Sequence, residues 1–337
     1  MRTAAVILAG THEWQRELFD ALCPRPLMPV ANRALVARAL DWARAGGICE
    51  AVVCTNRYAP LFRRTLGAGD RLGMQLLHYQ DVTPRGPAGC AADAARLIDA
   101  DRVLVIEGTV LPVCDAADVL YTHDAERNAA TVVIEDTDYG YSAPAGVFVL
   151  QAAALERVGQ AGYHDIKEGL IRELREGGQR VGSYRAVGRA SRVLDRESYL
   201  HAQQPAIRGV RAELEGYDRA GEALIHETAE VDASARFYGP VMIGPRAVVE
   251  RRATLIGPVV LGSGAVCREQ AIIVRTVLWS GSEVGAAAHV DHSILAGGFA
   301  LAPEMSATHE ICVNMLGERP ASAGVQKKAA TATMTGV

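Results

Sequence analysis

The segment VILAGTHEWQRELFDALCPRPLMPV, from Val6 to Val30, begins as the frame of a phosphate site. A buried strand that ends in a glycine lets a phosphate approach backbone N–H groups, and Arg25 further along could neutralise phosphate charge. The intervening loop is unsuited to that task, because Glu13 adds a carboxylate and Trp14 adds bulk. At about 4 Å and an effective dielectric near 20, each like-charge pair costs on the order of 4 kcal/mol. The segment therefore predicts the strand and the cation of a phosphate site, but a loop that does not suit phosphate binding.

A second glycine-rich stretch, GPAG from Gly86 to Gly89, is expected at the start of a helix. The free N–H groups of a helix N-terminus can hold an anion or the polar edge of a nucleotide. Glycines also occur at helix starts for purely structural reasons, so both interpretations stay open for this stretch.

Strand-like and helix-like segments alternate over the first two hundred residues, and they must position these candidates. Alternation of this kind predicts a mostly parallel, doubly wound α/β sheet, and the unbroken apolar runs predict strands buried on both faces. The strand-like runs are AAVILAG (4–10), CEAVVCTN (49–56), MQLLHYQ (74–80) and RVLVIEG (102–108), and the helix-like runs are ANRALVARALDWARAGG (31–47), APLFRRTLGAGDRLG (59–73) and GPAGCAADAARLID (86–99).

A period of six residues begins near residue 230. Such a period predicts a left-handed parallel β-helix, whose repeated apolar residue points into the core; an antiparallel sandwich is the alternative. The register slips by one residue near VLWSGSEVGAAAHVDHSIL. The apolar positions before the slip are Val231, Phe237, Ile243, Val249, Leu255, Leu261, Cys267 and Ile273, and those after it are Leu278, Val284 and Val290.

These patterns divide the 337 residues into four parts. We expect an α/β domain over 1–204, a helical connector over 205–229 and a β-helix of hexapeptide repeats over 230–302. Residues 303–337 form a C-terminal extension that we expect to be partly mobile, because its last part is small, polar and aperiodic.

Net charge, apolar runs and cysteine spacing exclude several classes of partner and location. A net charge of −4 gives no reason to expect a nucleic-acid or membrane partner, and no apolar run is long enough to span a bilayer. The seven cysteines are scattered without a C-x-x-C pair, which indicates reduced thiols and a cytoplasmic protein. No secretion signal is recognisable at the N-terminus.

An α/β domain followed by a hexapeptide β-helix resembles the sugar-1-phosphate nucleotidyltransferases, or NDP-sugar pyrophosphorylases, especially their mannose-1-phosphate guanylyltransferase-like branch. Local motifs carry the same resemblance. They are LAG at 8–10, PRPLMPV at 24–30, LGAGDRLGMQLLHYQ at 66–80, GPAG at 86–89, RVLVIEGTVL at 102–111 and PAGVFVL at 144–150.

The resemblance implies that a nucleoside triphosphate and a sugar 1-phosphate meet at the carboxyl ends of the strands, with release of pyrophosphate. It places Gly108 and Gly146 at the sugar and Arg25 at the position of a catalytic lysine. The residues it assigns to the nucleotide are Leu8, Ala9, Gly10, Gly86, Ala88 and Gly89.

The chain departs from the family pattern at the residues that do the chemistry. Thr109 and Arg192 stand where the family has two magnesium-binding aspartates, and Asp115 and Asp195 are the nearby substitutes. The hairpin with an E-K-P motif, which contacts the sugar phosphate in the family, is missing before residue 142. In the loop, the family's glycines, threonine and arginine are replaced by Thr11, Glu13, Trp14 and Gln15.

We therefore expect a catalytically degenerate family member, with no metal site and no cofactor, that acts as a regulatory or scaffolding subunit. It would bind a nucleotide sugar and assemble through its β-helix as a homo-oligomer or hetero-oligomer, with an active paralogue as one partner. One alternative is an active nucleotidyltransferase in which Arg25, Asp195 and Glu107 are repurposed and Mg²⁺ is the cofactor. A second alternative is a hexapeptide-repeat acyltransferase, whose base would be His289, His292 or His309.

Overall fold

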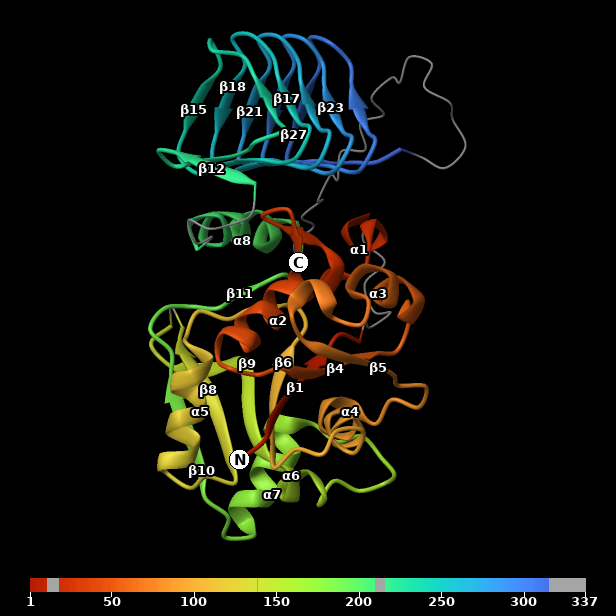
Figure 1. The fold of residues 1–337 in the computed structure, drawn as a ribbon, viewed down its shortest axis with the longest axis vertical. Coiled ribbons are helices and arrows are strands. Elements are labelled where there is room, and N and C mark those ends of the chain that lie inside the picture. Colours follow the sequence, from red (N-terminus) through yellow and green to blue (C-terminus); the bar gives the residue numbers. More distant parts are fainter. Residues whose placement is uncertain (11–17, 138, 210–215, 315–337) are drawn as a thin grey trace, which may run out of the picture. The chain divides into compact units, whose positions relative to one another are not determined.

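The computed structural model describes residues 1–10, 18–137, 139–209 and 216–314. The chain forms two compact units, Met1–Leu214 and Glu215–Val337, drawn in red to green and in green to blue in Figure 1. No helix in the described ranges is long and apolar enough to cross a membrane.

The first unit is built on one seven-stranded sheet with the order β10-β8-β9-β6-β1-β4-β5. Strand β9 runs antiparallel to both of its neighbours, and the other pairs are parallel. The predicted α/β sheet is thus confirmed, with one reversed strand in it. Its strands are β1 (Thr3–Leu8), β4 (Glu50–Thr55), β5 (Gln75–Gln80), β6 (Arg102–Glu107), β8 (Ala130–Asp136), β9 (Ser142–Gln151) and β10 (Val181–Arg185).

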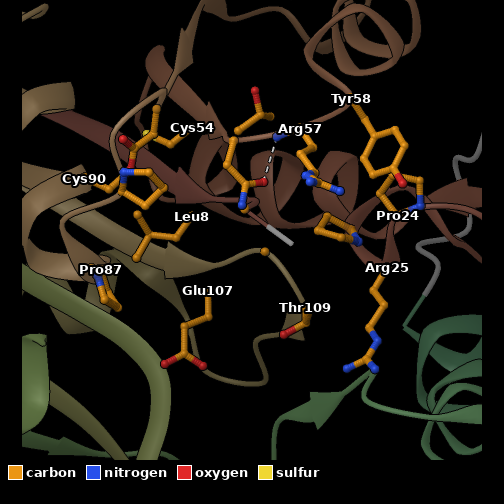
Figure 2. A pocket seen from close by; sticks show the side chains of 18 of the residues that line it. Leu8, Pro24, Arg25, Cys54, Arg57, Tyr58, Pro87, Cys90, Glu107 and Thr109 are labelled. Carbon is orange, nitrogen blue, oxygen red and sulfur yellow. Dashed lines mark hydrogen bonds between the residues drawn. The ribbon is translucent and has the colours of Figure 1, made fainter. Parts of the chain in front are cut away.

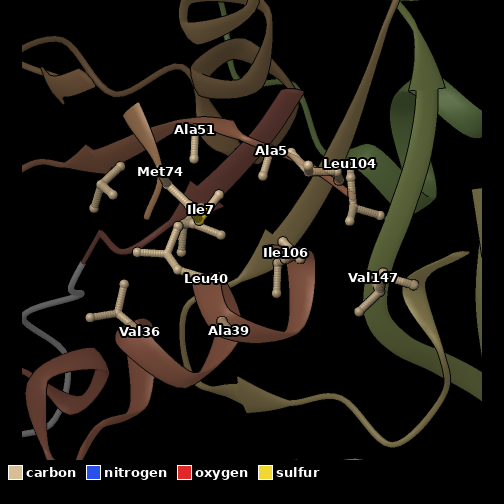
Figure 3. Packing of buried hydrophobic residues seen from close by; sticks show 14 of the residues in the cluster. Ala5, Ile7, Val36, Ala39, Leu40, Ala51, Met74, Leu104, Ile106 and Val147 are labelled. Atoms are coloured by element: carbon tan, nitrogen blue, oxygen red, sulfur yellow. The ribbon is translucent and has the colours of Figure 1, made fainter. Parts of the chain in front are cut away.

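Helices cover both faces of this sheet. On one face, Val36 and Leu40 of α2 pack against Ile7 and Ile106, and Figure 3 shows this cluster. On the other face, alanines of α4 pack with Val6 and other strand residues. The helices are α1 (Leu18–Leu22), α2 (Leu35–Ala45), α3 (Ala59–Leu66), α4 (Gly86–Ala95), α5 (Ala116–Ala125), α6 (Ala152–Leu155), α7 (Ile171–Glu176) and α8 (Arg196–Arg208).

Shorter elements complete the first unit. Two small antiparallel pairs, β2 with β3 and β7 with β11, lie outside the main sheet. These elements are η1 (Arg25–Leu27), β2 (Pro29–Val30), β3 (Arg33–Ala34), η2 (Asp70–Leu72), β7 (Val110–Leu111), η3 (Ile166–Leu170) and β11 (Ser191–Arg192).

The second unit is a parallel β-helix, as the period of six predicts (Figure 1). Its coils stack on one another, and strands from successive coils form three sheets. The predicted inward positions from Ile243 to Val290 are buried in its core. One sheet holds β12 (Tyr217–Ala220), β13 (Ala223–His226), β16 (Val241–Ile243), β19 (Val259–Leu261), β22 (Val277–Leu278), β25 (Ile294–Leu295) and β28 (Ile311–Cys312). The second holds β14 (Glu230–Val231), β17 (Val248–Val249), β20 (Val266–Cys267), β23 (Glu283–Val284) and β26 (Ala300–Leu301). The third holds β15 (Arg236–Tyr238), β18 (Thr254–Ile256), β21 (Ile272–Val274), β24 (His289–Asp291) and β27 (Ser306–Thr308).

The register slip has a local cause in one corner of the β-helix. Ile256 pairs with Val274 and Val260 pairs with Val277, so the turn after Val274 is one residue shorter than the turn above it. The later turns at this corner, from Asp291 to Ile294 and from Thr308 to Ile311, are equally short, so the inward positions shift by one residue in each coil from there onward.

Two predicted boundaries differ from the structure. Helix α8 ends at Arg208, and residues 217–226 form the antiparallel pair β12–β13 rather than a helix. Gly221 has a φ of 64°, which suits the tight turn of a hairpin. The stacked coils also continue to Cys312, beyond the expected end at 302. Residues 315–337, the rest of the expected C-terminal extension, lie outside the described residues.

Candidate functional site

A cavity of about 790 Å³ opens at the carboxyl ends of β1, β4 and β6. Because β4 and β6 flank β1 on opposite sides, this is the point where the strand order reverses. Ligands of doubly wound folds bind at such switch points. The volume lies within the range of small-molecule sites, about 300–1,000 Å³. Figure 2 shows Leu8, Cys54 and Glu107 around this cavity.

The residues that the sequence assigns to a nucleotide divide into two groups. Leu8, Gly10 and Gly86 line the cavity. The other three are buried behind its wall: Ala9 donates its N–H to the Cys54 carbonyl at 2.8 Å, and Ala88 donates to the His164 carbonyl at 3.0 Å. Gly89 is buried in α4, where an added Cβ would lie 2.6 Å from the Arg85 Cβ.

Thr11, Glu13, Trp14 and Gln15 lie outside the described residues.

Arg25 lines the cavity, but its guanidinium is held by a carboxylate of the protein. Its Nε donates to Asp20 Oδ1 at 2.7 Å and its Nη2 donates to Asp20 Oδ2 at 3.1 Å. Asp20 belongs to α1, and Arg25 begins the short helix η1. A bidentate pair of this kind fixes the guanidinium and compensates its charge. Less of that charge is therefore available to a phosphate than the sequence alone suggests.

Glu107 stands at the end of β6 between two cations. Arg192 Nη1 donates to its Oε2 at 2.5 Å, and Lys167 Nζ pairs with its Oε1 at 2.9 Å. Arg192 also donates from Nη2 to the Pro144 carbonyl at 2.8 Å. These three side chains come from β6, η3 and β11, elements that are far apart in the chain. Both carboxylate oxygens of Glu107 are thereby engaged within the protein.

The two cations decide the charge state of Glu107. Burial by itself would raise the pKa of this carboxyl, but the Arg192 guanidinium and the Lys167 ammonium outweigh burial and hold the pKa below its ordinary value. Glu107 is therefore ionised at neutral pH. The group of three carries a net charge of about +1, since one carboxylate faces two cations.

Gly146, predicted at the sugar, does not line the cavity but makes room for this ion pair. It lies in β9 with a φ of 80°, which favours glycine. An added Cβ would lie 2.9 Å from Glu107 Oε2 and 3.1 Å from Arg192 Nη2. Gly108, by contrast, lines the cavity, and a Cβ there would lie 2.9 Å from the Leu8 carbonyl oxygen.

The two aspartates considered as substitute metal ligands both cap helices. Asp115 accepts the N–H of Ala117 at the start of α5. Asp195 forms a capping box with Ser198 at the start of α8, and the hydrogen bonds from Ser198 lower the pKa of Asp195. Thr109 lines the cavity with a neutral hydroxyl in place of a carboxylate.

The hairpin that the sequence suggests to be missing is indeed short. Strands β8 and β9 are joined by residues 137–141 alone, and Thr137 donates its N–H to the Tyr141 carbonyl at 2.9 Å. The described part of this connection offers no lysine toward the cavity.

Sequence reasoning missed Lys167, which lines the cavity and pairs with Glu107. A signal for it exists, because Lys167 is the only lysine among residues 1–326 in a chain that otherwise uses arginine. It also missed Tyr58 and Tyr163, which line the cavity and expose 53% and 70% of their surface. No spacing in the sequence connects these tyrosines.

Comparisons with known proteins support the fold and the family that the sequence resembles. Residues 20–153 match the family model described as nucleotidyl transferase. A curated mannose-1-phosphate guanylyltransferase of Mycobacterium tuberculosis is 21% identical over 267 residues, which cover 71% of this chain and 74% of the relative. A crystal structure from Bacillus anthracis, described as a glucose-1-phosphate thymidylyltransferase with sucrose, has a TM-score of 0.57 at 14% identity. That likeness covers 62% of this chain and 96% of the other, and it concerns the fold.

Proposed function

We propose that this chain, which belongs to the sugar-1-phosphate nucleotidyltransferase family, binds a nucleotide sugar without converting it. The observation that carries the proposal is the ion-paired group of Glu107, Lys167 and Arg192. The motif resemblance places Arg192 where the family has a magnesium-binding aspartate, and in the structure its guanidinium donates to Glu107 at 2.5 Å.

A magnesium ion does not suit the residues at this place. Mg²⁺ requires oxygen ligands in near-octahedral geometry and is usually held by carboxylates. Both oxygens of Glu107 already accept from cations, Thr109 is neutral, and Asp195 is engaged at the start of α8. The nucleotidyl transfer of the family depends on charge neutralisation at the phosphates. The residues at this place therefore do not suit a magnesium-dependent transfer.

The same group offers positive charge without a metal. Lys167 and Arg192 together outweigh the charge of Glu107, and Lys167 lines the cavity. A diphosphate, which keeps its charge in the product of the family reaction, would be attracted to this end of the cavity. A nucleotide sugar is the product of the family reaction, so its binding requires no catalytic step.

The remaining walls suit a nucleoside and a sugar. Tyr58, Tyr163 and Phe148 line the cavity together with Leu8 and several prolines. Aromatic side chains stack on bases irrespective of sequence or base identity. The cavity of about 790 Å³ is large enough for a nucleotide sugar.

Calorimetry and an activity assay together test the proposal. GDP-mannose, UDP-glucose and dTDP-glucose are titrated into the protein in EDTA and again in Mg²⁺, and pyrophosphate release is followed with each nucleoside triphosphate and mannose or glucose 1-phosphate. We expect binding of one nucleotide sugar in EDTA and no pyrophosphate. Magnesium-dependent turnover would overturn the proposal, and so would the failure of all three ligands to bind.

Variants of Lys167 connect the result to the site. Lys167→Met should weaken binding by about tenfold, whereas Lys167→Arg should retain most of it because the charge stays. Arg172→Met, an exposed cation on α7 that pairs weakly with Glu176, is the matched control and should bind as the unaltered protein does.

We further propose that this protein acts as a regulatory or scaffolding subunit. A protein that binds a nucleotide sugar without turnover can report its concentration to a partner, and a β-helix offers an extended surface for assembly. The partner would be a second copy of this chain or an active paralogue. Light scattering after gel filtration, with and without the nucleotide sugar, tests whether the chain assembles and whether the ligand changes its state.

The active-enzyme alternative would need Arg25, Asp195 and Glu107 as functional groups. Each of them has a partner within the protein, namely Asp20, Ser198 and the cation pair. Pyrophosphate release that is abolished by Arg25→Ala would favour this alternative. The acyltransferase alternative is tested by titration with acetyl-CoA.

A further inference from the structure

One corner of the β-helix brings two histidines and a carboxylate together. His292 follows β24 directly, and His309 occupies the same position one coil later, after β27. Asp291 pairs in register with Thr308, so the two corners stack on each other. This group lies in the second unit and is independent of the nucleotide-sugar proposal.

The contacts at this corner are specific. The rings of His292 and His309 lie 4.8 Å apart between centroids, with an angle of 9° between their planes. Asp291 Oδ1 lies 2.8 Å from His292 Nδ1. One potential ligand atom from each of the three residues lies within 4.8 Å of the others. Both histidines have a positive φ, 44° at His292 and 56° at His309, so the turn itself directs them to this place.

The donor set indicates which kind of ion it would hold. Two imidazoles and one carboxylate are typical ligands of zinc and of neighbouring first-row metals, whereas Mg²⁺ and Ca²⁺ prefer oxygen ligands only. In a tetrahedral zinc site with bonds of about 2.0–2.1 Å, neighbouring ligand atoms are about 3.3 Å apart. Asp291 Oδ1 and His292 Nδ1 already lie 2.8 Å apart, so the approach needed for such a site falls on His309. His309 is exposed, so rotation of its side chain would bring a ring nitrogen closer to the other two groups.

We propose that Asp291, His292 and His309 form a binding site for a zinc-type divalent cation that fastens neighbouring coils of the β-helix. Asp291 and His292 belong to one coil and His309 to the next, so a bound ion would tie the corner between β24 and β25 to the corner between β27 and β28. The latter strands are the last described ones in their sheets. Among the described residues no further coil stacks on these strands, and the exposed end of a stack of coils is stabilised when it is capped or cross-linked.

Other charged groups near the corner set the conditions for the test. Arg275 holds the equivalent corner position one coil earlier, with a φ of 42°, and Glu310 follows His309. Zinc binding requires neutral imidazoles, and the test is therefore carried out at pH 7.5.

The test is calorimetry with Zn²⁺ on the full chain at pH 7.5, after EDTA has been removed. We expect one zinc per chain. His292→Ala and His309→Ala should each weaken binding at least tenfold, and Asp291→Asn should weaken it about tenfold. His289→Ala, an exposed histidine on β24 in the same coil, is the matched control and should leave the isotherm unchanged.

Cobalt and thermal unfolding give independent readouts. Co²⁺ bound to this donor set should produce visible absorption bands that are absent in His292→Ala/His309→Ala. Zn²⁺ should raise the unfolding temperature of the unaltered protein and of His289→Ala, but not of the double variant. An isotherm that is the same in the double variant would overturn the proposal, and so would the absence of binding at 100 µM zinc.

Discussion

Arg192 donates to Glu107 at 2.5 Å across 85 residues of chain, and this contact joins β11 to the carboxyl end of β6. The pair stands at the switch point of the sheet, where a nucleotide-binding fold receives its ligand. Lys167 engages the other oxygen of Glu107, so this carboxylate is held between two cations. In our proposal this arrangement attracts an anionic ligand and leaves Glu107 unavailable to a magnesium ion.

Removing the guanidinium should destabilise the first unit. In Arg192→Met, Glu107 would keep Lys167 but lose its 2.5 Å partner, and the Pro144 carbonyl would lose a donor. The side chains of Arg192 and Glu107 are only 25% and 26% exposed, so water replaces the lost contacts incompletely. We expect the free energy of unfolding to fall by about 2 kcal/mol. Urea denaturation followed by circular dichroism measures it.

A double variant tests whether the charge of Glu107 causes the loss of stability in Arg192→Met. Arg192→Met/Glu107→Gln removes the carboxylate that has lost its guanidinium partner, so it should recover part of the lost stability. Equal or greater destabilisation of the double variant would contradict the account of the pair.

Gly146→Ala should disturb the ion pair between Glu107 and Arg192, because the added methyl group would press against both side chains. Alanine at a φ of 80° is strained, and its Cβ would lie 2.8 Å from Val110 Cγ2 and 2.9 Å from Glu107 Oε2. We expect a loss of about 2 kcal/mol in unfolding free energy and weaker binding of the nucleotide sugar. Gly140→Ala, which also has a positive φ but meets no atom within 4 Å, controls for backbone strain alone. Equal losses in the two variants would show that the contacts with Glu107 do not matter.

The fold was predictable because its signals are local and repeated. The strand run AAVILAG and the helix beginning at Gly86 both form where the periodicity places them. The β-helix repeats one apolar position through many coils, and even its slip of one residue is visible before Leu278. The hairpin of β12 and β13 escaped prediction because its turn depends on Gly221 alone within an otherwise helix-like composition.

The site was less predictable because its partners are distant in the chain. The motif resemblance places Arg192 at the position of an aspartate, but it does not predict that the guanidinium donates to Glu107. Asp195 has the right charge for a metal ligand, and only the structure shows its engagement with Ser198. The pairing of Arg25 with Asp20 is close in sequence, yet it depends on the geometry of two short helices.

Asp195 should behave as a helix cap in mutagenesis. Asp195→Ala removes acceptors for the Ser198 N–H and hydroxyl, and we expect a loss of about 1 kcal/mol in unfolding free energy. Asp195→Asn should retain most of the stability, because asparagine is an equally good N-cap. A metal ligand would respond differently, since an amide would not replace a carboxylate at Mg²⁺. Loss of a magnesium-dependent activity in Asp195→Asn would therefore contradict this assignment.

His123 should make the first unit sensitive to mild acid. The ring is fully buried, with Nδ1 2.9 Å from the Thr131 hydroxyl and Nε2 2.8 Å from the Gln151 amide nitrogen. Burial and the neighbouring Arg102 lower the pKa of His123 from 6.5 to about 4, against a smaller opposite effect of Asp124.

The sign of the pH effect follows from these values. Between pH 6.5 and about 4 the unfolded chain binds a proton that the folded protein does not, so the stability present above pH 6.5 declines as the pH falls through this window. The decline should reach about 3 kcal/mol, since each pKa unit corresponds to about 1.4 kcal/mol. His123→Gln should remove this part of the pH dependence while other acidic groups still titrate. Urea denaturation of both proteins from pH 7.5 to 4 measures the difference, and parallel pH profiles would contradict a neutral buried histidine at this position.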